Sequence, residues 1–214
     1  MSLSRRRMIA LVGGGTIVAA SGAFGLAVTR RPTRATEAWA LAGGYGEVRR
    51  DALSFALLAP NPHNRQPWLV DLAEPGVVTL YADPARMLPQ TDPVNRQITV
   101  GLGGFLELMR MAAAEAGHRV DIATFPQGEN PAALDGRPIA RAVFTADPGV
   151  TRDPLFAAVP DRRSLKEPYD TRRPVPAEAV AQAGAAVRTA RFGASTAPDD
   201  IAFWRALTRE ALRL

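Results

Sequence analysis

The chain has no cysteine and only two histidines among its 214 residues. Without cysteine there can be no disulfide, thiolate metal site, iron–sulfur cluster or thiol catalysis. Two imidazoles, His63 and His118, are too few for a protein-built zinc or di-iron centre, so we expect no metal site. A glycine-rich phosphate loop is also lacking, because the glycine group at 101–104 falls inside a helical pattern. We expect these glycines to allow close helix packing.

Lysine is nearly absent as well. Lys166 is the only one, so arginine supplies almost all of the positive charge behind a formal net charge of +5. Guanidinium groups suit phosphate or anionic lipid, but the same excess can reflect a GC-rich coding bias, and both explanations stay open. Aromatic residues are not interleaved with the basic ones, and no zinc finger or RNA-binding pattern occurs. Nucleic acid is therefore not an expected partner.

Residues 1–45 are typical of a targeting segment followed by a linker. Ser4 and three arginines precede an uncharged run from Met8 to Val28, which resembles a twin-arginine signal. Several glycines make the run less apolar than a usual membrane span. An uncleaved anchor is the alternative, because about 20 apolar residues can cross a bilayer. We expect export through the twin-arginine translocase, to an extracytoplasmic or membrane-anchored location, and cleavage of the signal stays open.

The rest of the chain mixes helical and strand patterns. A helix at 49–58 is expected to stop at Pro60, and Gly117 is expected to close a long helix. In chain order the patterns predict a helix at 49–58, strands at 68–72 and 77–81, a helix at 95–116, strands at 119–125 and 138–145, and helices at 153–159, 177–187 and 199–214. The first two strands should form a hairpin. This order indicates an α+β fold, without regular βαβ repetition.

A stiff polar turn, APNPHNRQPW at residues 59–68, separates the first helix from the hairpin. Its prolines lower the entropy that the loop loses when it is ordered. Amides held at fixed positions suit a heteroaromatic ring with alternating donors and acceptors, such as the pyrimidine edge of a flavin. The alternative is an ordinary connection in which asparagine side chains cap their own backbone. His63 has no obvious carboxylate partner, and we interpret it as a turn residue.

A second polar cluster lies much later in the chain. Arg162, Arg163, Ser164 and Lys166 place two guanidiniums, a hydroxyl and an ammonium within five consecutive residues. Such a set can clamp a phosphate monoester, with arginine in bidentate geometry and lysine as a point charge. A solvated charged loop is the alternative.

Together the two segments resemble the nitroreductase superfamily, whose members bind flavin mononucleotide (FMN). The turn is similar to that family's A-P-S-x-x-N-x-Q-P-W pattern, with Asn61 in place of the usual serine. The basic cluster is similar to the R-x-S-x-R/K element that holds the flavin phosphate, although here it follows the turn. That order resembles the internally duplicated branch of the superfamily, in which two subunit-like halves share one polypeptide.

The resemblance implies an antiparallel or mixed sheet flanked by helices, with a complete first half at 46–150 and the start of a second half at 151–214. It implies one composite flavin site, shared across a pseudo-dimer or a homodimer. The residues implied to bind FMN are Pro60, Asn61, Pro62 and Asn64 near the ring, and Arg162, Arg163, Ser164 and Lys166 at the phosphate. Since the core strands of a second half are missing before Leu214, we expect a truncated product or a fragment.

The implied function is an FMN-dependent oxidoreductase that passes electrons from a reduced nicotinamide, or another donor, to a small organic acceptor. The protein would orient the ring and tune its electronics, so no acid–base pair is required and no catalytic residue is assigned. A protein that binds or sequesters FMN without turnover is the alternative, because export would remove it from the cytoplasmic nicotinamide supply. A structural or membrane-associated fragment without a ligand is a third hypothesis.

Overall fold

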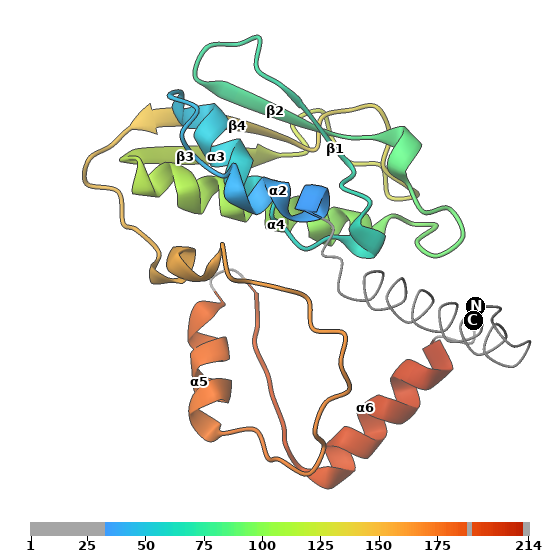
Figure 1. The fold of residues 1–214 in the computed structure, drawn as a ribbon. Coiled ribbons are helices and arrows are strands. Elements are labelled where there is room, and N and C mark those ends of the chain that lie inside the picture. Colours follow the sequence, from blue (N-terminus) through green and yellow to red (C-terminus); the bar gives the residue numbers. More distant parts are fainter. Residues whose placement is uncertain (1–32, 188–189, 212–214) are drawn as a thin grey trace, which may run out of the picture. The chain divides into compact units, whose positions relative to one another are not determined.

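The computed structural model describes residues 33–187 and 190–211 (Figure 1). The predicted twin-arginine motif and its uncharged run lie outside these residues, so export stays a prediction. Within the described part of the chain, no helix combines the length and the apolar character needed to cross a membrane. The chain divides into two compact units, Met1–Ser164 and Leu165–Leu214. The predicted halves at 46–150 and 151–214 stay a prediction.

Four antiparallel strands form the sheet of the first unit (Figure 1). They are β1 (Trp68–Asp71), β2 (Val77–Ala82), β3 (His118–Thr124) and β4 (Ala140–Ala146), in the spatial order β1-β2-β4-β3. Register places Trp68 opposite Ala82 and Leu80 opposite Ala140. The predicted hairpin is confirmed, because β1 and β2 pair directly across the Glu74-Pro75-Gly76 turn. Gly76 takes a positive φ of 71° there, a conformation that glycine adopts without strain.

Three α-helices accompany this sheet: α2 (Thr33–Ala40), α3 (Val48–Ala56) and α4 (Arg96–Glu115). The long helix α4 runs along one face of the sheet and packs against α3 and β3 (Figure 1). Asp92 caps its start by accepting a hydrogen bond from the Ile98 amide at 2.9 Å. Gly117, with a φ of 69°, closes it as predicted.

The apolar stripe of α4 forms the centre of the core, as its helical spacing predicts. Phe105 is 1% exposed, and its ring lies 4.9 Å from that of Trp68, which opens β1. The remaining core side chains come from α3, the sheet and both ends of α4. They include Ala52, Ala56, Val78, Leu80, Ile98, Leu102, Met109, Ala140 and Ala142. The face of α4 opposite this stripe is not part of the core and includes exposed residues such as Val100 and Gly103.

Two elements differ from the sequence prediction. The helix predicted at 153–159 forms as a short 3-10 helix, Pro154–Ala158. Asp153 caps it by accepting from the Leu155 amide at 3.0 Å, and the segment is too short to develop α-helical turns. Helix α2 was not predicted, since it lies in the expected linker and its sequence TRATEAWA contains one large apolar residue, Trp39. The confirmed elements begin and end within about two residues of their predicted limits.

The second unit contains helices α5 (Ala177–Ala186) and α6 (Pro198–Ala211). None of the helical residues described in this unit is buried. Its ring contacts include Phe203 with Trp204, whose centroids are 5.4 Å apart. The two helices confirm the predicted helical segments at 177–187 and 199–214, apart from residues 212–214, which lie outside the described range.

Candidate functional site

The polar turn is held in shape by its own amide groups. The Asn61 side chain donates to the Ala59 carbonyl at 3.1 Å and accepts from the Gln66 amide at 2.8 Å. His63, Asn64 and Gln66 all have a φ of 50°, which is uncommon for residues other than glycine. Asn61 therefore caps its own backbone, the alternative that its composition left open. Its second amide hydrogen and the remaining lone pair of its oxygen are still available to a ligand.

Two arginines fix the far side of the turn to the loop after β2. Arg65 donates to the carbonyls of Arg86 and Ala85 at 3.1 and 2.9 Å. Arg86 returns a bond to the Arg65 carbonyl at 2.9 Å. Three reciprocal bonds leave the turn little freedom to move when a ligand arrives, which lowers the entropy cost of binding.

Helix α4 approaches the turn closely because it carries a glycine there. A Cβ added at Gly101 would lie 3.2 Å from the Asn61 Cβ and 3.3 Å from the Pro62 Cδ. Gly104 is less tight, with the Pro60 Cδ at 3.9 Å, and Gly103 has nothing within 4 Å. Close packing, as expected for this glycine group, holds at Gly101 but not at Gly103.

Replacing Gly101 and Gly103 with alanine should have opposite effects on stability. Gly103→Ala is expected to raise the free energy of unfolding by about 0.5–1 kcal/mol, because alanine is the better helix former and the space is open. Gly101→Ala gains the same propensity but crowds the turn, and overpacking costs about 1–3 kcal/mol. Urea unfolding followed by circular dichroism checks the difference. Equal changes in the two variants would show that the turn does not press on the helix.

The basic segment meets the first part of the fold directly. The Arg162 Nη2 donates to the carbonyl of Leu58 at 2.8 Å, across 104 positions of sequence. The Arg162 Nε is buried and has no hydrogen-bond partner among the described residues. Buried donors are almost always paired in native proteins. The segment that the sequence assigned to a phosphate thus lies against the end of α3, just before the turn, with one donor unused.

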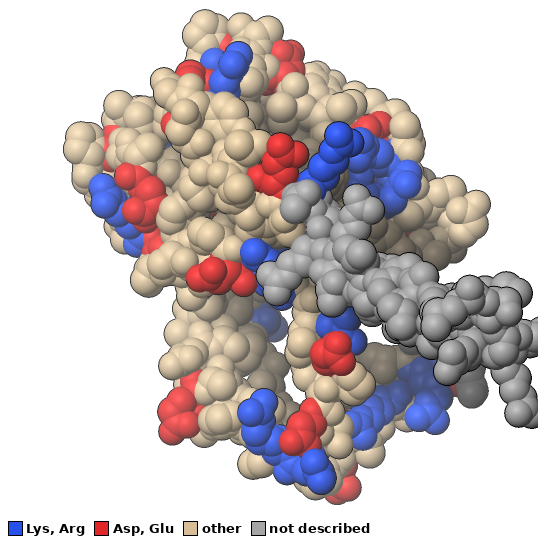
Figure 2. All heavy atoms as spheres, in the orientation of Figure 1, with Lys and Arg blue, Asp and Glu red and all other residues tan. Residues whose placement is uncertain are grey.

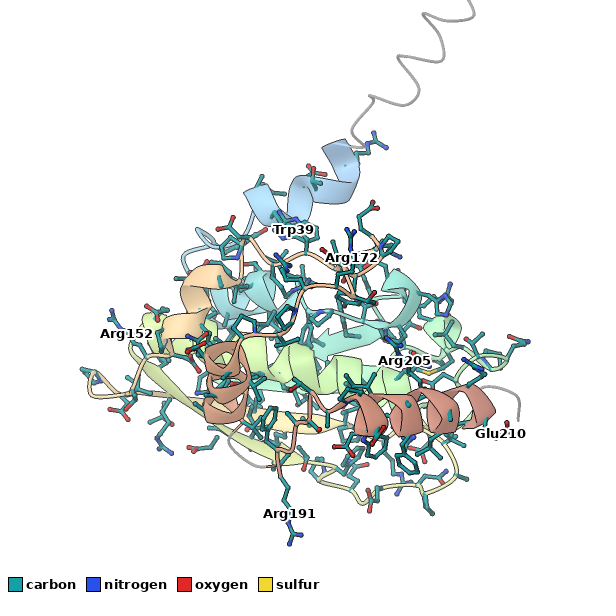
Figure 3. The ribbon with its side chains drawn as sticks, turned by 90° about the horizontal axis from the view of Figure 1, so that it is seen from below. Trp39, Arg152, Arg172, Arg191, Arg205 and Glu210 are labelled. Carbon is teal, nitrogen blue, oxygen red and sulfur yellow. The ribbon has the colours of Figure 1, made fainter. Side chains whose placement is uncertain are left out.

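Arg163 contacts backbone carbonyls of its own segment and the ring of Trp39. Its Nη1 donates to the carbonyls of Pro160 and Arg162 at 2.7 and 2.8 Å. The guanidinium lies 4.5 Å from the ring centroid of Trp39, which is labelled near the end of α2 in Figure 3. Such cation–π contacts contribute about 0.5–1 kcal/mol at exposed sites. Arg163 therefore joins α2 to the basic segment.

A hollow of about 680 Å³ lies where the turn, α4 and the basic segment converge. Its volume falls within the range of small-molecule sites. The lining consists of Pro60, Asn61, Pro62, Arg96, Gln97, Val100, Gly101, Gly103, Gly104, Glu107 and Ser164. Its surface is mostly apolar, with a few polar groups between the prolines and valine. The turn and Ser164, which the sequence assigned to one ligand, thus share one hollow.

Two charged side chains line this hollow, and only one of them is compensated. Glu107 forms a bidentate pair with Arg110, with nitrogen–oxygen distances of 2.6 and 2.8 Å. These hydrogen bonds raise the pKa of Arg110 above its usual value, although its partial burial opposes the shift. Arg96 is exposed and has no hydrogen bond or ion pair with any residue that the structure describes.

The structure brings together four of the predicted ligand residues at the hollow: Pro60, Asn61, Pro62 and Ser164. Asn64 is exposed in the turn without lining the hollow, and Arg162 bonds to Leu58, the residue just before the turn. Lys166 belongs to the second unit, where it is exposed. The assigned ligand roles of all these residues stay predictions.

Sequence reasoning missed the α4 residues of the hollow. Arg96, Val100 and Gly104 follow each other at a spacing of four and therefore lie on one helix face. A weak signal was present, because valine and two glycines interrupt what should be the solvated face of an amphipathic helix. Among the described residues, no group of three or more ligating side chains could hold a metal ion.

The donor set of the hollow suits a phosphorylated aromatic ligand such as FMN. The Asn61 and Gln97 amides can meet a ring edge, and the Ser164 hydroxyl and the Arg96 guanidinium can meet phosphate oxygens. Pro60, Pro62 and Val100 supply the apolar walls against which a ring packs. The buried Arg162 Nε is a further donor, and it has no acceptor among the residues that the structure describes.

No family model matches the chain. The chain is 33% identical over 125 residues to a Mycobacterium tuberculosis protein named "Putative NAD(P)H nitroreductase acg", covering 58% of this chain and 38% of that one. A second protein of that organism with the same enzyme description is 31% identical over 147 residues, covering 69% and 40%. The chain thus spans well under half the length of these relatives. They support the resemblance to the nitroreductase superfamily.

One solved structure in the comparison is described as a putative nitroreductase in complex with FMN, from Desulfovibrio desulfuricans. It shares 16% identity with the chain, covers 66% of this chain and 99% of its own, and superposes with a TM-score of 0.36.

Proposed function

We propose that the chain carries an FMN site and acts as an oxidoreductase of nitroreductase type, passing electrons from a reduced nicotinamide or another donor to a small organic acceptor. The observation that carries this proposal is that residues of the polar turn and Ser164 line the same hollow. Support also comes from the relatives named as NAD(P)H nitroreductases, which match 125 and 147 residues of the chain. We propose the same activity for the whole protein, because the chain spans 38% and 40% of the length of these relatives.

The residues of the hollow would bind and orient the cofactor. Asn61 and Gln97 would hold the polar edge of the ring, while Pro60 and Val100 would pack on it and exclude water. Ser164 would donate to the phosphate. A bound FMN supplies a centre that accepts a hydride and passes electrons on. Glu107 stays paired with Arg110, so the hollow offers no acid–base pair from its described charged groups.

The purified protein tests the proposal through its visible spectrum and an FMN titration. We expect flavin absorbance, or quenching of FMN fluorescence on titration into the apoprotein. Bleaching by NADPH and recovery with a nitroaromatic compound would establish turnover. Binding without bleaching by nicotinamide or another donor would favour a protein that only holds FMN. A colourless protein that fails to bind added FMN would exclude both functions.

Filling the hollow should block FMN binding. Val100 is 71% exposed and lines the hollow, whereas Val94 is 63% exposed and does not. Val100→Trp is expected to weaken FMN binding by about tenfold, because the indole takes the space of the ring. Val94→Trp is the matched control and should leave affinity unchanged. Fluorescence titration gives the dissociation constants, and equal effects in the two variants would place the ligand elsewhere.

A further inference from the structure

The charge of the hollow points to an anionic part of its ligand. Arg96 and Glu107 are the two charged residues of the lining. Glu107 is neutralised by both of its hydrogen bonds to Arg110. Arg96 keeps its charge uncompensated among the described residues, on a mostly apolar wall that screens it less than open water does.

Arg162 and Arg163, which the sequence assigned to a phosphate, already donate hydrogen bonds to backbone carbonyls. Arg162 donates to the Leu58 carbonyl, and Arg163 donates to two carbonyls of its own segment while it stacks on Trp39. In both side chains some of the five donors are therefore committed. The guanidinium of Arg96 donates to none of the residues that the structure describes.

We propose that Arg96 is the phosphate anchor of this hollow and takes part of the role that the sequence assigned to Arg162 and Arg163. This inference rests on the proposed function, and it names the recognised group as a phosphate ester. The guanidinium fork matches two phosphate oxygens, and Ser164 adds a hydroxyl to the same lining from the basic segment.

Two ligands of the proposed enzyme carry such an ester, FMN itself and a reduced nicotinamide dinucleotide. Their shared chemistry is a phosphate oxygen pair that accepts hydrogen bonds from a guanidinium. Separate titrations identify which of them Arg96 holds. Riboflavin, which has the same ring without the phosphate, isolates the contribution of the ester.

The test compares Arg96→Ala, Arg96→Lys and the control Arg50→Ala. The Arg50 side chain is also exposed and also has no hydrogen bond or ion pair with the described residues, but it lies on α3 outside the lining. We expect Arg96→Ala to raise the dissociation constant for FMN about tenfold and that for riboflavin less than twofold, the pattern of a lost charge-assisted bond. Arg96→Lys should recover part of the loss, and Arg50→Ala should change neither constant.

A loss seen only when NADPH is titrated against the FMN-loaded protein would also support the proposal and assign the ester to the nicotinamide nucleotide. Equal losses for FMN and riboflavin, or unchanged constants for FMN and NADPH, would overturn it. Thermal unfolding should be unchanged in Arg96→Ala, because the side chain is exposed and has no hydrogen bond or ion pair with the described residues.

Failure of the proposed function can be told apart from failure of this inference. If the wild-type chain binds no flavin, titration with inorganic phosphate still tests Arg96, with binding followed by calorimetry. Phosphate binding that disappears in Arg96→Ala but persists in Arg50→Ala supports the anchor without the flavin. Absence of phosphate binding by the wild-type chain as well would overturn it.

Discussion

Replacing Phe105 with alanine is expected to lower the free energy of unfolding by about 3–5 kcal/mol, the usual cost of removing a large core ring. Phe105 is 1% exposed at the middle of α4 and packs at 4.9 Å against the ring of Trp68. The cavity would open between the helix and the first strand, directly behind the turn. Urea unfolding followed by circular dichroism at 222 nm measures the change.

The control for this prediction is Val100→Ala on the same helix. Val100 is 71% exposed, so its truncation removes little buried surface, and alanine favours the helix. We expect a change within about 0.5 kcal/mol. A loss below about 1 kcal/mol for Phe105→Ala would mean that α4 does not pack on the sheet through this ring. Trp68 fluorescence, which reports on the ring next to Phe105, should shift to longer wavelength in Phe105→Ala only.

The sequence predicted the elements that local patterns determine. The hairpin followed from two alternating strands around Gly76, and α4 followed from apolar positions such as Leu102 and Phe105 at helical spacing. The helix predicted at 153–159 is of the 3-10 type, which the pattern did not specify, because five residues with a proline start are compatible with either helix type. Local pattern therefore predicted the architecture and left the helix type open where the segment is short.

The candidate site depends on contacts that local patterns do not contain. The bond from Arg162 to the Leu58 carbonyl spans 104 positions, and only the family resemblance suggested that the two segments meet. The internal bonds of Asn61 could be weighed but not decided from composition. Arg96 was missed because a charged residue on a helix surface usually faces water. Its importance appears only once Gly101 and the turn define a wall beside it.

Many arginines of the first unit have ordinary surface roles. Basic and acidic side chains of this unit are interspersed on the face visible in Figure 2. Several arginines there are paired with carboxylates or donate to backbone carbonyls, among them Arg49 with Glu47 and Arg137 with Asp135. The Arg137 hydrogen bond lowers the pKa of Asp135 to about 2. The charge of Arg96 differs from these because it lines the hollow and has no described partner.

Arg162 should contribute to both stability and ligand binding, and two substitutions separate these roles. Arg162→Met removes every donor while keeping a long apolar side chain. The carbonyl of Leu58, a residue only 1% exposed, then loses its partner, which costs about 1–3 kcal/mol. We also expect FMN affinity to fall by more than the tenfold predicted for Arg96→Ala, because the segment that presents Ser164 is released from the turn.

Arg162→Lys distinguishes a direct ligand contact from a purely structural role. A lysine ammonium can replace the bond to the Leu58 carbonyl but cannot replace the buried Nε donor, which has no partner among the described residues. If that donor binds the ligand, Arg162→Lys should recover most of the stability and little of the FMN affinity. Chemical unfolding and fluorescence titration on the same samples measure both. Parallel recovery of stability and affinity would limit Arg162 to holding Ser164 in place, and the unpaired Nε would then need an acceptor other than FMN.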